Sequence, residues 1–205
     1  MTSEQKKFYD IKNYHDYKKI GDDLDYAIII DDNSIILQFQ ETTSKTDWKN
    51  NFSFLPWPLK LSGRVVWTTH GYARAYSSGA FIPLAEFYHE HLKSPDKKLI
   101  IRGWSFGSAM TKIAARHFVI KTGKMLDEVT TFGDVKCWVN PFTRYKKNIK
   151  RLREYTTPND FVTWCVPFYH RTNKCKVGPR FSFKKIFKTE YYHTHYEEYD
   201  YELFI

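Results

Sequence analysis

The stretch Gly103-Trp104-Ser105-Phe106-Gly107 constrains the fold more than any other part of the chain. It follows an apolar run at 98–101 that has the pattern of a buried strand, and it precedes residues 109–115, whose small side chains are typical of a tightly packed helix. A serine between two glycines at a strand-to-helix turn is the pattern of a nucleophile elbow, in which the serine backbone is strained and the glycines avoid clashes. The same turn places the Phe106 amide at a helix N-terminus, where it can stabilise a developing negative charge. The motif therefore predicts a serine nucleophile, with an ordinary strand-to-helix turn as the alternative.

The hydrophobic pattern predicts strands that alternate with helices. Apolar runs predict strands at 26–30, 34–39, 64–68, 98–101, 128–132 and 152–156, the first two as a hairpin around residues 31–33. Helical spacing predicts helices at about 4–20, 72–92 and 109–115. This alternation is typical of an α/β fold with a mostly parallel central sheet covered by helices on both faces. The 205 residues show no repeat and no boundary, so we expect a single domain over residues 1–205.

The composition is that of a globular chain with a strong positive charge. Hydrophobic residues make up 42% of the chain, and the formal net charge is +9. Basic runs at 146–151 and 180–188 suit a solvated surface, an anionic membrane surface or an anionic substrate. No nucleic-acid-binding motif accompanies them, so no nucleic acid partner is expected.

The cysteines and the N-terminal residues indicate in which cellular compartment the protein resides. Cys137, Cys165 and Cys175 have no metal-ligand spacing and indicate free thiols in a reducing compartment, with a Cys165–Cys175 bridge as the alternative. Residues 1–7 lack the apolar core of a signal peptide, and no run is long enough to span a bilayer. We therefore expect a cytoplasmic protein.

A serine nucleophile requires a base and an acid that orients the base, and in this fold class they follow in the order serine, acid, histidine. Asp160 is the best acid, because it follows the strand at 152–156 and would lie at the carboxyl edge of the sheet, where open α/β sheets bind ligands. A turn or cap aspartate after Pro158-Asn159 is the alternative. His193 and His195 are the candidate bases. Their alternating spacing also suits a metal pair, but no companion ligand stands nearby, so neither a metal nor another cofactor is expected.

Seven blocks in order, over about residues 25–200, resemble the class 3 lipases, the fungal-lipase-like α/β-hydrolases. Three of them are similar to the family patterns F-R-G-T-x-S-x-x-D-W, G-H-S-L-G-G-A and N-D-x-V. The blocks are 39–48 (FQETTSKTDW), 71–76 (GYARAY), 103–109 (GWSFGSA), 131–133 (TFG), 159–162 (NDFV), 167–170 (PFYH) and 193–196 (HTHY). Each block alone is weak, whereas the ordered set is specific.

The resemblance implies a carboxylic ester hydrolase with a serine–aspartate–histidine triad, acting on acylglycerols or related lipids. The matched positions imply Ser105, Asp160 and His193 as the triad, and Thr42 and Phe106 as oxyanion donors. Phospholipase or thioesterase activity would use the same residues, and a catalytically idle binding module is the alternative from another class.

His193 is favoured over His195 as the base for two reasons. The family's base is commonly followed three residues later by an aromatic residue, and Tyr196 holds that place relative to His193. Glu197 and Glu198 stand close to His195 and would favour its charged form, which cannot accept a proton.

The chain departs from the family pattern at three positions, none of them in the triad. Glu41 replaces a glycine beside Thr42, Trp104 replaces the elbow histidine, and Ser108 replaces a second glycine.

The region between Trp48 and the strand at 64 is too short for a long helical lid. Instead, residues 52–59 form a predicted compact apolar loop, in which Phe54, Leu55 and Trp57 are expected to contact an acyl chain. Membrane contact and packing against the sheet are the alternatives.

Overall fold

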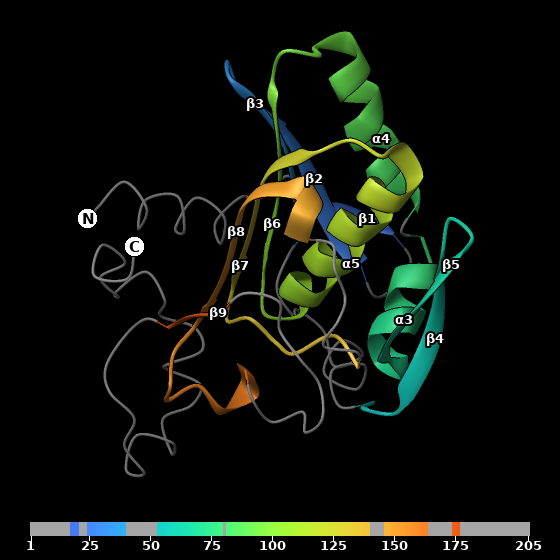
Figure 1. The fold of residues 1–205 in the computed structure, drawn as a ribbon, viewed down its shortest axis with the longest axis vertical. Helices are drawn as coiled ribbons and strands as arrows, with labels where there is room; N and C mark the ends of the chain where they lie inside the picture. The colour runs from blue at the N-terminus through green and yellow to red at the C-terminus, as the bar shows by residue number, and fades with distance from the viewer. Residues whose placement is uncertain are drawn as a thin grey trace.

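The computed structural model describes residues 17–20, 24–39, 53–79, 81–139, 146–163 and 174–176 (Figure 1). Within these ranges the main sheet has the strand order β1-β2-β3-β6-β7-β8-β9. Its strands are β1 (Lys18–Ile20), β2 (Leu24–Ile30), β3 (Ser34–Phe39), β6 (Lys98–Trp104), β7 (Leu126–Phe132), β8 (Ile149–Thr156) and β9 (Lys174–Lys176). The β1–β2 and β2–β3 pairs are antiparallel, and every pair from β3 to β9 is parallel. The predicted α/β class and mostly parallel sheet are confirmed.

The predicted first hairpin forms because Asp31 caps its turn. Its Oδ1 accepts hydrogen bonds from the amides of Asn33 (2.8 Å) and Ser34 (2.6 Å), and its Oδ2 accepts one from Ser34 Oγ (2.7 Å). Such an aspartate turn reverses the chain without a glycine. The apolar residues on both sides then pair as β2 and β3.

Helices α4 (Phe81–Lys93) and α5 (Phe106–Thr122) cover one side of the sheet, on the right in Figure 1. The β3–β6 and β6–β7 crossovers advance in the same direction along the sheet, and right-handed crossovers of that kind place their helices on the same face. Leu37, Ile101, Ile113 and Val129 are buried between α5 and the sheet. A helical cover on the second face stays a prediction. No helix in the described ranges is long and apolar enough to cross a membrane.

The helix expected at 72–92 is two helices, α3 (His70–Ser77) and α4, and the prediction of one continuous helix was wrong. The break lies at Gly79, where a Cβ would come within 1.8 Å of Ile20 Cγ2. Ile20 belongs to β1, which pairs with β2, so the prediction that the helix at 4–20 reaches residue 20 was wrong as well. Residues 4–16 lie outside the described ranges.

Strands β4 (Pro56–Leu61) and β5 (Arg64–Thr69) form a separate two-stranded sheet. Ser62 (φ 44°) and Gly63 (φ 86°) make the turn between them, and two successive positive φ angles are those of a type I′ hairpin. Residues 52–59 were predicted as a loop, but Pro56–Leu59 are part of β4, because they pair with Val66–Thr69. The short-lid prediction falls partly on residues 40–52, which lie outside the described ranges.

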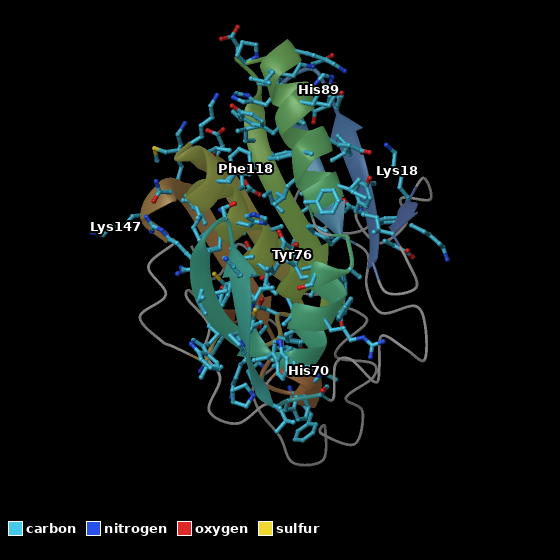
Figure 2. All side chains as sticks on the ribbon, turned by 90° about the vertical axis from the view of Figure 1, so that its right-hand side faces the viewer. Lys18, His70, Tyr76, His89, Phe118 and Lys147 are labelled. Carbon is cyan, nitrogen blue, oxygen red and sulfur yellow. The ribbon has the colours of Figure 1, made fainter. Side chains whose placement is uncertain are left out.

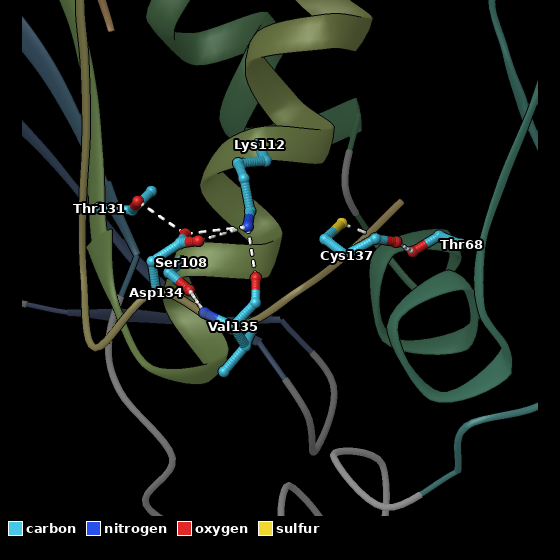
Figure 3. A network of polar contacts seen from close by, with 7 residues as sticks. All are labelled: Thr68, Ser108, Lys112, Thr131, Asp134, Val135 and Cys137. Carbon is cyan, nitrogen blue, oxygen red and sulfur yellow. Dashed lines mark hydrogen bonds and ion pairs between the residues drawn. The ribbon is translucent and has the colours of Figure 1, made fainter. Parts of the chain in front are cut away.

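A buried ion pair attaches the segment after β7 to α5 (Figure 3). Lys112 Nζ lies 2.8 Å from Asp134 Oδ1, and both side chains are fully buried. Thr131 Oγ1 donates a hydrogen bond to the same carboxylate (2.7 Å), and Lys112 also donates to the carbonyl of Val135. The Val135 amide donates to Ser108 Oγ (3.1 Å), so α5 holds this segment at two points.

The same segment is also attached to the β4–β5 hairpin. Thr68 Oγ1 donates to the carbonyl of Cys137 (2.7 Å), and the Val139 amide donates to the carbonyl of Trp67 (3.1 Å). Cys137 and Cys175 are free thiols, as predicted, and burial raises the pKa of the Cys137 thiol to about 11. Cys165 lies outside the described ranges.

Replacement of Lys112 by methionine should destabilise the protein strongly. It removes the ammonium and leaves the Asp134 carboxylate buried without its counter-ion, which costs about 3–5 kcal/mol of unfolding free energy in other buried pairs. Urea denaturation measures the loss. Lys121→Met is the matched control, because Lys121 lies exposed on the same helix, and it should change stability by less than about 0.5 kcal/mol. Equal stabilities for the two variants would contradict the structural role of the pair.

Candidate active site

Ser105 stands between the end of β6 and the first residue of α5 with a strained backbone, at φ 52° and ψ −117°. A non-glycine residue adopts this region only where its surroundings hold it there. Two hydrogen bonds do so: the Ser105 amide donates to the carbonyl of Phe132 (2.8 Å), and the Ser108 amide donates to the carbonyl of Ser105 (2.9 Å). The strand–turn–helix context predicted for the G-x-S-x-G motif is confirmed.

Gly103 allows β6 and α5 to approach each other closely. A Cβ at this position would lie 2.5 Å from the Gly107 carbonyl oxygen and 2.5 Å from Thr111 Oγ1. The Gly107 backbone cannot move far enough to accept a side chain at position 103 unless the whole of α5 shifts. The motif therefore needs its first glycine for packing, as the sequence predicted.

Phe106 begins α5, so the helix holds no carbonyl that its amide can reach. Its ring is buried and lies 6.0 Å from the ring of Tyr72 in α3, which fixes the first turn of α5. The amide therefore has the position expected of an oxyanion donor. Thr42, the other predicted donor, lies outside the described ranges, as does Glu41.

Asp160 is fully buried in the loop that follows β8. The Asp160 amide donates to the carbonyl of Thr157 (3.2 Å), and Thr163 Oγ1 donates to the carbonyl of Asp160 (2.8 Å). This tight turn holds the aspartate at the carboxyl edge of the sheet, where the sequence places it.

The strand register brings the ends of four strands to one edge. Phe39 in β3 lies opposite Gly103, Gly103 lies opposite Thr131, and Thr131 lies opposite Glu154. Ser105 and Asp160 thus follow two strands, β6 and β8, that are separated only by β7. The axes of β6 and β8 are two strand spacings apart, about 10 Å.

His193 and His195 lie outside the described ranges, so the predicted base is not located. Several described histidines have other partners. His70 Nδ1 lies 3.1 Å from Ser53 Oγ, and His91 Nε2 lies 2.9 Å from Lys124 Nζ. His117 contacts Ser62 Oγ (2.9 Å) and Tyr76 Oη (3.0 Å), and burial, together with nearby Lys121, lowers its pKa.

Two departures from the family pattern have structural explanations. Trp104 is buried against Phe132 (6.0 Å between ring centroids), and Phe132 stacks on Tyr155 (5.4 Å), so the elbow tryptophan ends a row of aromatic rings across three strands. Ser108 supplies the hydroxyl that binds the Val135 amide. Neither substitution disturbs the turn at Ser105.

The predicted acyl-contact residues lie at the start of the β4–β5 hairpin. Leu55 is 72% exposed and Trp57 is 49% exposed, whereas Phe54 is only partly accessible. The Leu55 carbonyl accepts a hydrogen bond from the His70 amide (2.7 Å), and the Trp57 and His70 rings are 4.7 Å apart. Contact with a substrate stays a prediction for all three residues.

An apolar pocket of about 230 Å³ lies away from the elbow, between α4 and α5. It is lined in part by Leu84, Tyr88 and Phe118, and Phe118 follows Phe106 by about 18 Å along the helix. Across the described residues, no group of three or more His, Cys, Asp and Glu side chains is placed to hold a metal ion.

Sequence reasoning missed the Lys112–Asp134 pair behind the elbow. The signal was slight: Lys112 stands four residues after Ser108, on the face of α5 that carries the small residues. A lysine on that face requires a buried counter-ion, but its partner is 22 residues away in sequence.

Ser105→Gly should be more stable than Ser105→Ala by about 1 kcal/mol. Glycine relieves a strain of about 1–3 kcal/mol, and the greater entropy of its unfolded chain offsets up to about 1 kcal/mol of that gain. Chemical denaturation of both variants measures the difference. The same pair of substitutions at Arg74, an exposed interior position in α3, is the control and should have the opposite sign, since glycine lowers the stability of a helix interior. Equal signs at the two positions would show that Ser105 is not strained.

Comparison with known proteins finds similarity in structure and none in sequence: no family model matches the chain, and no curated protein matches it. A fungal lipase in complex with an inhibitor is similar with a TM-score of 0.67 and 19% identity, over 79% of this chain and 65% of that one. The triacylglyceride lipase of Rhizomucor miehei has a TM-score of 0.63 and 19% identity, over 75% of this chain and 61% of the lipase.

A triacylglycerol lipase whose catalytic centre is formed by a serine protease triad is similar with a TM-score of 0.63 and 16% identity, over 75% of this chain and 61% of that one. The matched region spans less than two thirds of each of these three proteins. The chain therefore has the α/β-hydrolase fold of the fungal lipases, and the resemblance seen in its sequence blocks is confirmed for the fold.

Proposed function

We propose that the chain is a serine carboxylic-ester hydrolase of the lipase or esterase type. The observation that carries the proposal is the Ser105 backbone, strained at the apex of a strand-to-helix turn. Strain of this kind persists at functional sites because it positions a reactive group. The likeness to triacylglycerol lipases supports the same assignment, since a serine protease triad forms the catalytic centre of one of them.

Ser105 is the nucleophile, Asp160 the orienting acid and His193 the general base, with His195 as the alternative base. In this scheme His193 takes the Ser105 proton as Oγ attacks the ester carbonyl. Asp160 holds the imidazole in the tautomer that accepts this proton. The protonated histidine then protonates the leaving alcohol, and water hydrolyses the acyl-enzyme by the same steps in reverse.

The oxyanion of each tetrahedral intermediate binds the amides of Phe106 and Thr42. Phe106 supplies the first amide of α5, at the positive end of the helix dipole. Phe39 ends β3 opposite Gly103, so the chain leaves β3 beside the elbow only three residues before Thr42. That proximity supports Thr42 as the second donor.

The substrate class is an ester with an apolar acyl chain. Structural neighbours include triacylglycerol lipases, and Leu55, Trp57 and Phe161 offer exposed apolar surface. Phe161 directly follows Asp160. Phospholipids and thioesters would react through the same groups, so a substrate panel decides among these classes.

Turnover of short p-nitrophenyl esters tests the proposal. Ser105→Ala should lower kcat by about a million-fold, and Asp160→Asn by about ten-thousand-fold, because the asparagine holds the wrong imidazole tautomer. Ser77→Ala, at an exposed helix position, is the control and should keep full activity. A Ser105→Ala variant with more than a few per cent of wild-type activity would show that Ser105 is not the nucleophile. An inactive wild-type protein would favour the idle binding module.

Alanine substitutions assign the base. His193→Ala should be as inactive as Ser105→Ala, whereas His195→Ala should keep at least a tenth of wild-type kcat. The reverse pattern would make His195 the base. Two active variants would refute the triad, while circular dichroism of each variant confirms that the chain is folded.

A further inference from the structure

The outer face of the β4–β5 hairpin is apolar and exposed. In the register, Pro58 lies opposite Trp67, and Lys60 lies opposite Val65, so these four side chains share one face. Trp67 is 48% exposed and Val65 is 58% exposed. The opposite face, with Leu59, Leu61 and Val66, is buried in the core. Figure 2 shows the hairpin at the surface, in front of α5.

Both edges of the hairpin are closed to an added strand. Pro56 and Pro58 lack the amide donors that a strand pairing with β4 would need. The outer edge of β5 is occupied in part, because the Val139 amide binds the Trp67 carbonyl. A ligand can therefore bind the face of the hairpin but not its edges. This disfavours an extended peptide, which binds by adding a strand to an edge.

The charge around this face has one sign. Residues 53–79 include Lys60, Arg64 and Arg74, all exposed, and contain no aspartate or glutamate. Elsewhere, exposed lysines pair with acidic neighbours, as Lys18 does with Glu86 and Lys150 does with Asp127. The hairpin thus combines exposed aromatic and aliphatic side chains with cations that have no acid on their own segment.

We propose that the outer face of the hairpin docks on the surface of an anionic phospholipid bilayer. Tryptophan prefers the headgroup level of a bilayer, and basic side chains beside it bind anionic headgroups. Trp67 and Val65 contact the lipid, and Lys60 extends from the same face. Arg64 pairs with Leu61 in the register, so it lies off this face, and its exposed side chain binds headgroups from the hairpin tip.

Docking in this orientation lays the length of the hairpin along the bilayer. The hairpin tip lies beside the later part of α5, since Ser62 contacts His117. Its open end, with Leu55 and Trp57, lies beside His70, at the lower end of the molecule in Figure 2. The proposal does not depend on Ser105 being a nucleophile, because binding needs no turnover.

Sedimentation with extruded vesicles tests the docking surface on the full chain. Wild-type protein should bind vesicles of phosphatidylcholine with 30% phosphatidylserine at least tenfold more tightly than vesicles of phosphatidylcholine alone, in about 0.1 M salt. The double variant Lys60→Glu, Arg64→Glu should lose at least tenfold in affinity for the anionic vesicles. Trp67→Ala should lose affinity without any change of charge, and Val65→Ser repeats this test if the tryptophan variant does not fold.

The matched control is Lys19→Glu, Lys147→Glu, which changes the net charge equally at exposed positions on β1 and in the 3-10 turn before β8. It should bind within about threefold of wild type. Equal losses in the two double variants would overturn the proposal, because total charge alone would then explain binding. Wild-type protein that binds neither kind of vesicle would also overturn it and would leave a protein as the occupant of the face.

The hairpin variants should hydrolyse a soluble short ester at the wild-type rate. Failure of the docking proposal is therefore distinguishable from failure of the catalytic assignment.

Discussion

The close approach of β6 to the first turns of α5 is the constraint on which the rest of the structure depends. Gly103 permits it, since any side chain there would meet the Gly107 carbonyl and Thr111. With the strand and helix so close, the chain must reverse within one residue, and Ser105 takes the strained conformation that results. The hydroxyl of that residue then stands at the carboxyl edge of the sheet, beside the start of a helix dipole. The same turn therefore packs β6 closely against α5 and places a serine in the geometry of a nucleophile.

The polar groups behind the elbow support this turn. Lys112, Asp134 and Ser108 join α5 to the segment that leaves β7, and the Phe132 carbonyl binds the Ser105 amide directly. Burying an ion pair costs desolvation free energy. Its directional contacts nevertheless fix which groups pair, whereas apolar contacts tolerate shifts between the packed segments. The same segment continues to the β4–β5 hairpin through Cys137 and Val139. Elbow, sheet edge and hairpin are therefore connected through one short stretch of chain.

Local patterns predicted the elements that local forces determine. The hairpin around Asp31, the β6–elbow–α5 unit and strands β7 and β8 are set by apolar runs, a capping aspartate and glycines. Contacts between distant segments were not predictable from those patterns: Gly79 against Ile20, the pairing that makes Pro56–Leu61 a strand, and Asp134 as the partner of Lys112. For the site, strand order was enough to place Ser105 and Asp160 at one edge. The base and the second oxyanion donor depend on Thr42, His193 and His195, outside the described ranges, and they stay predictions.

Covalent labelling tests the central claim, that the strained turn positions Ser105 as a nucleophile. An alkyl fluorophosphonate reacts with a serine only where a base and an oxyanion site are assembled around it. Peptide mass spectrometry should find one phosphonate per chain, on Ser105, in the native protein, and none after labelling in urea. A native protein that stays unlabelled, or that carries the label on another residue, would contradict the account.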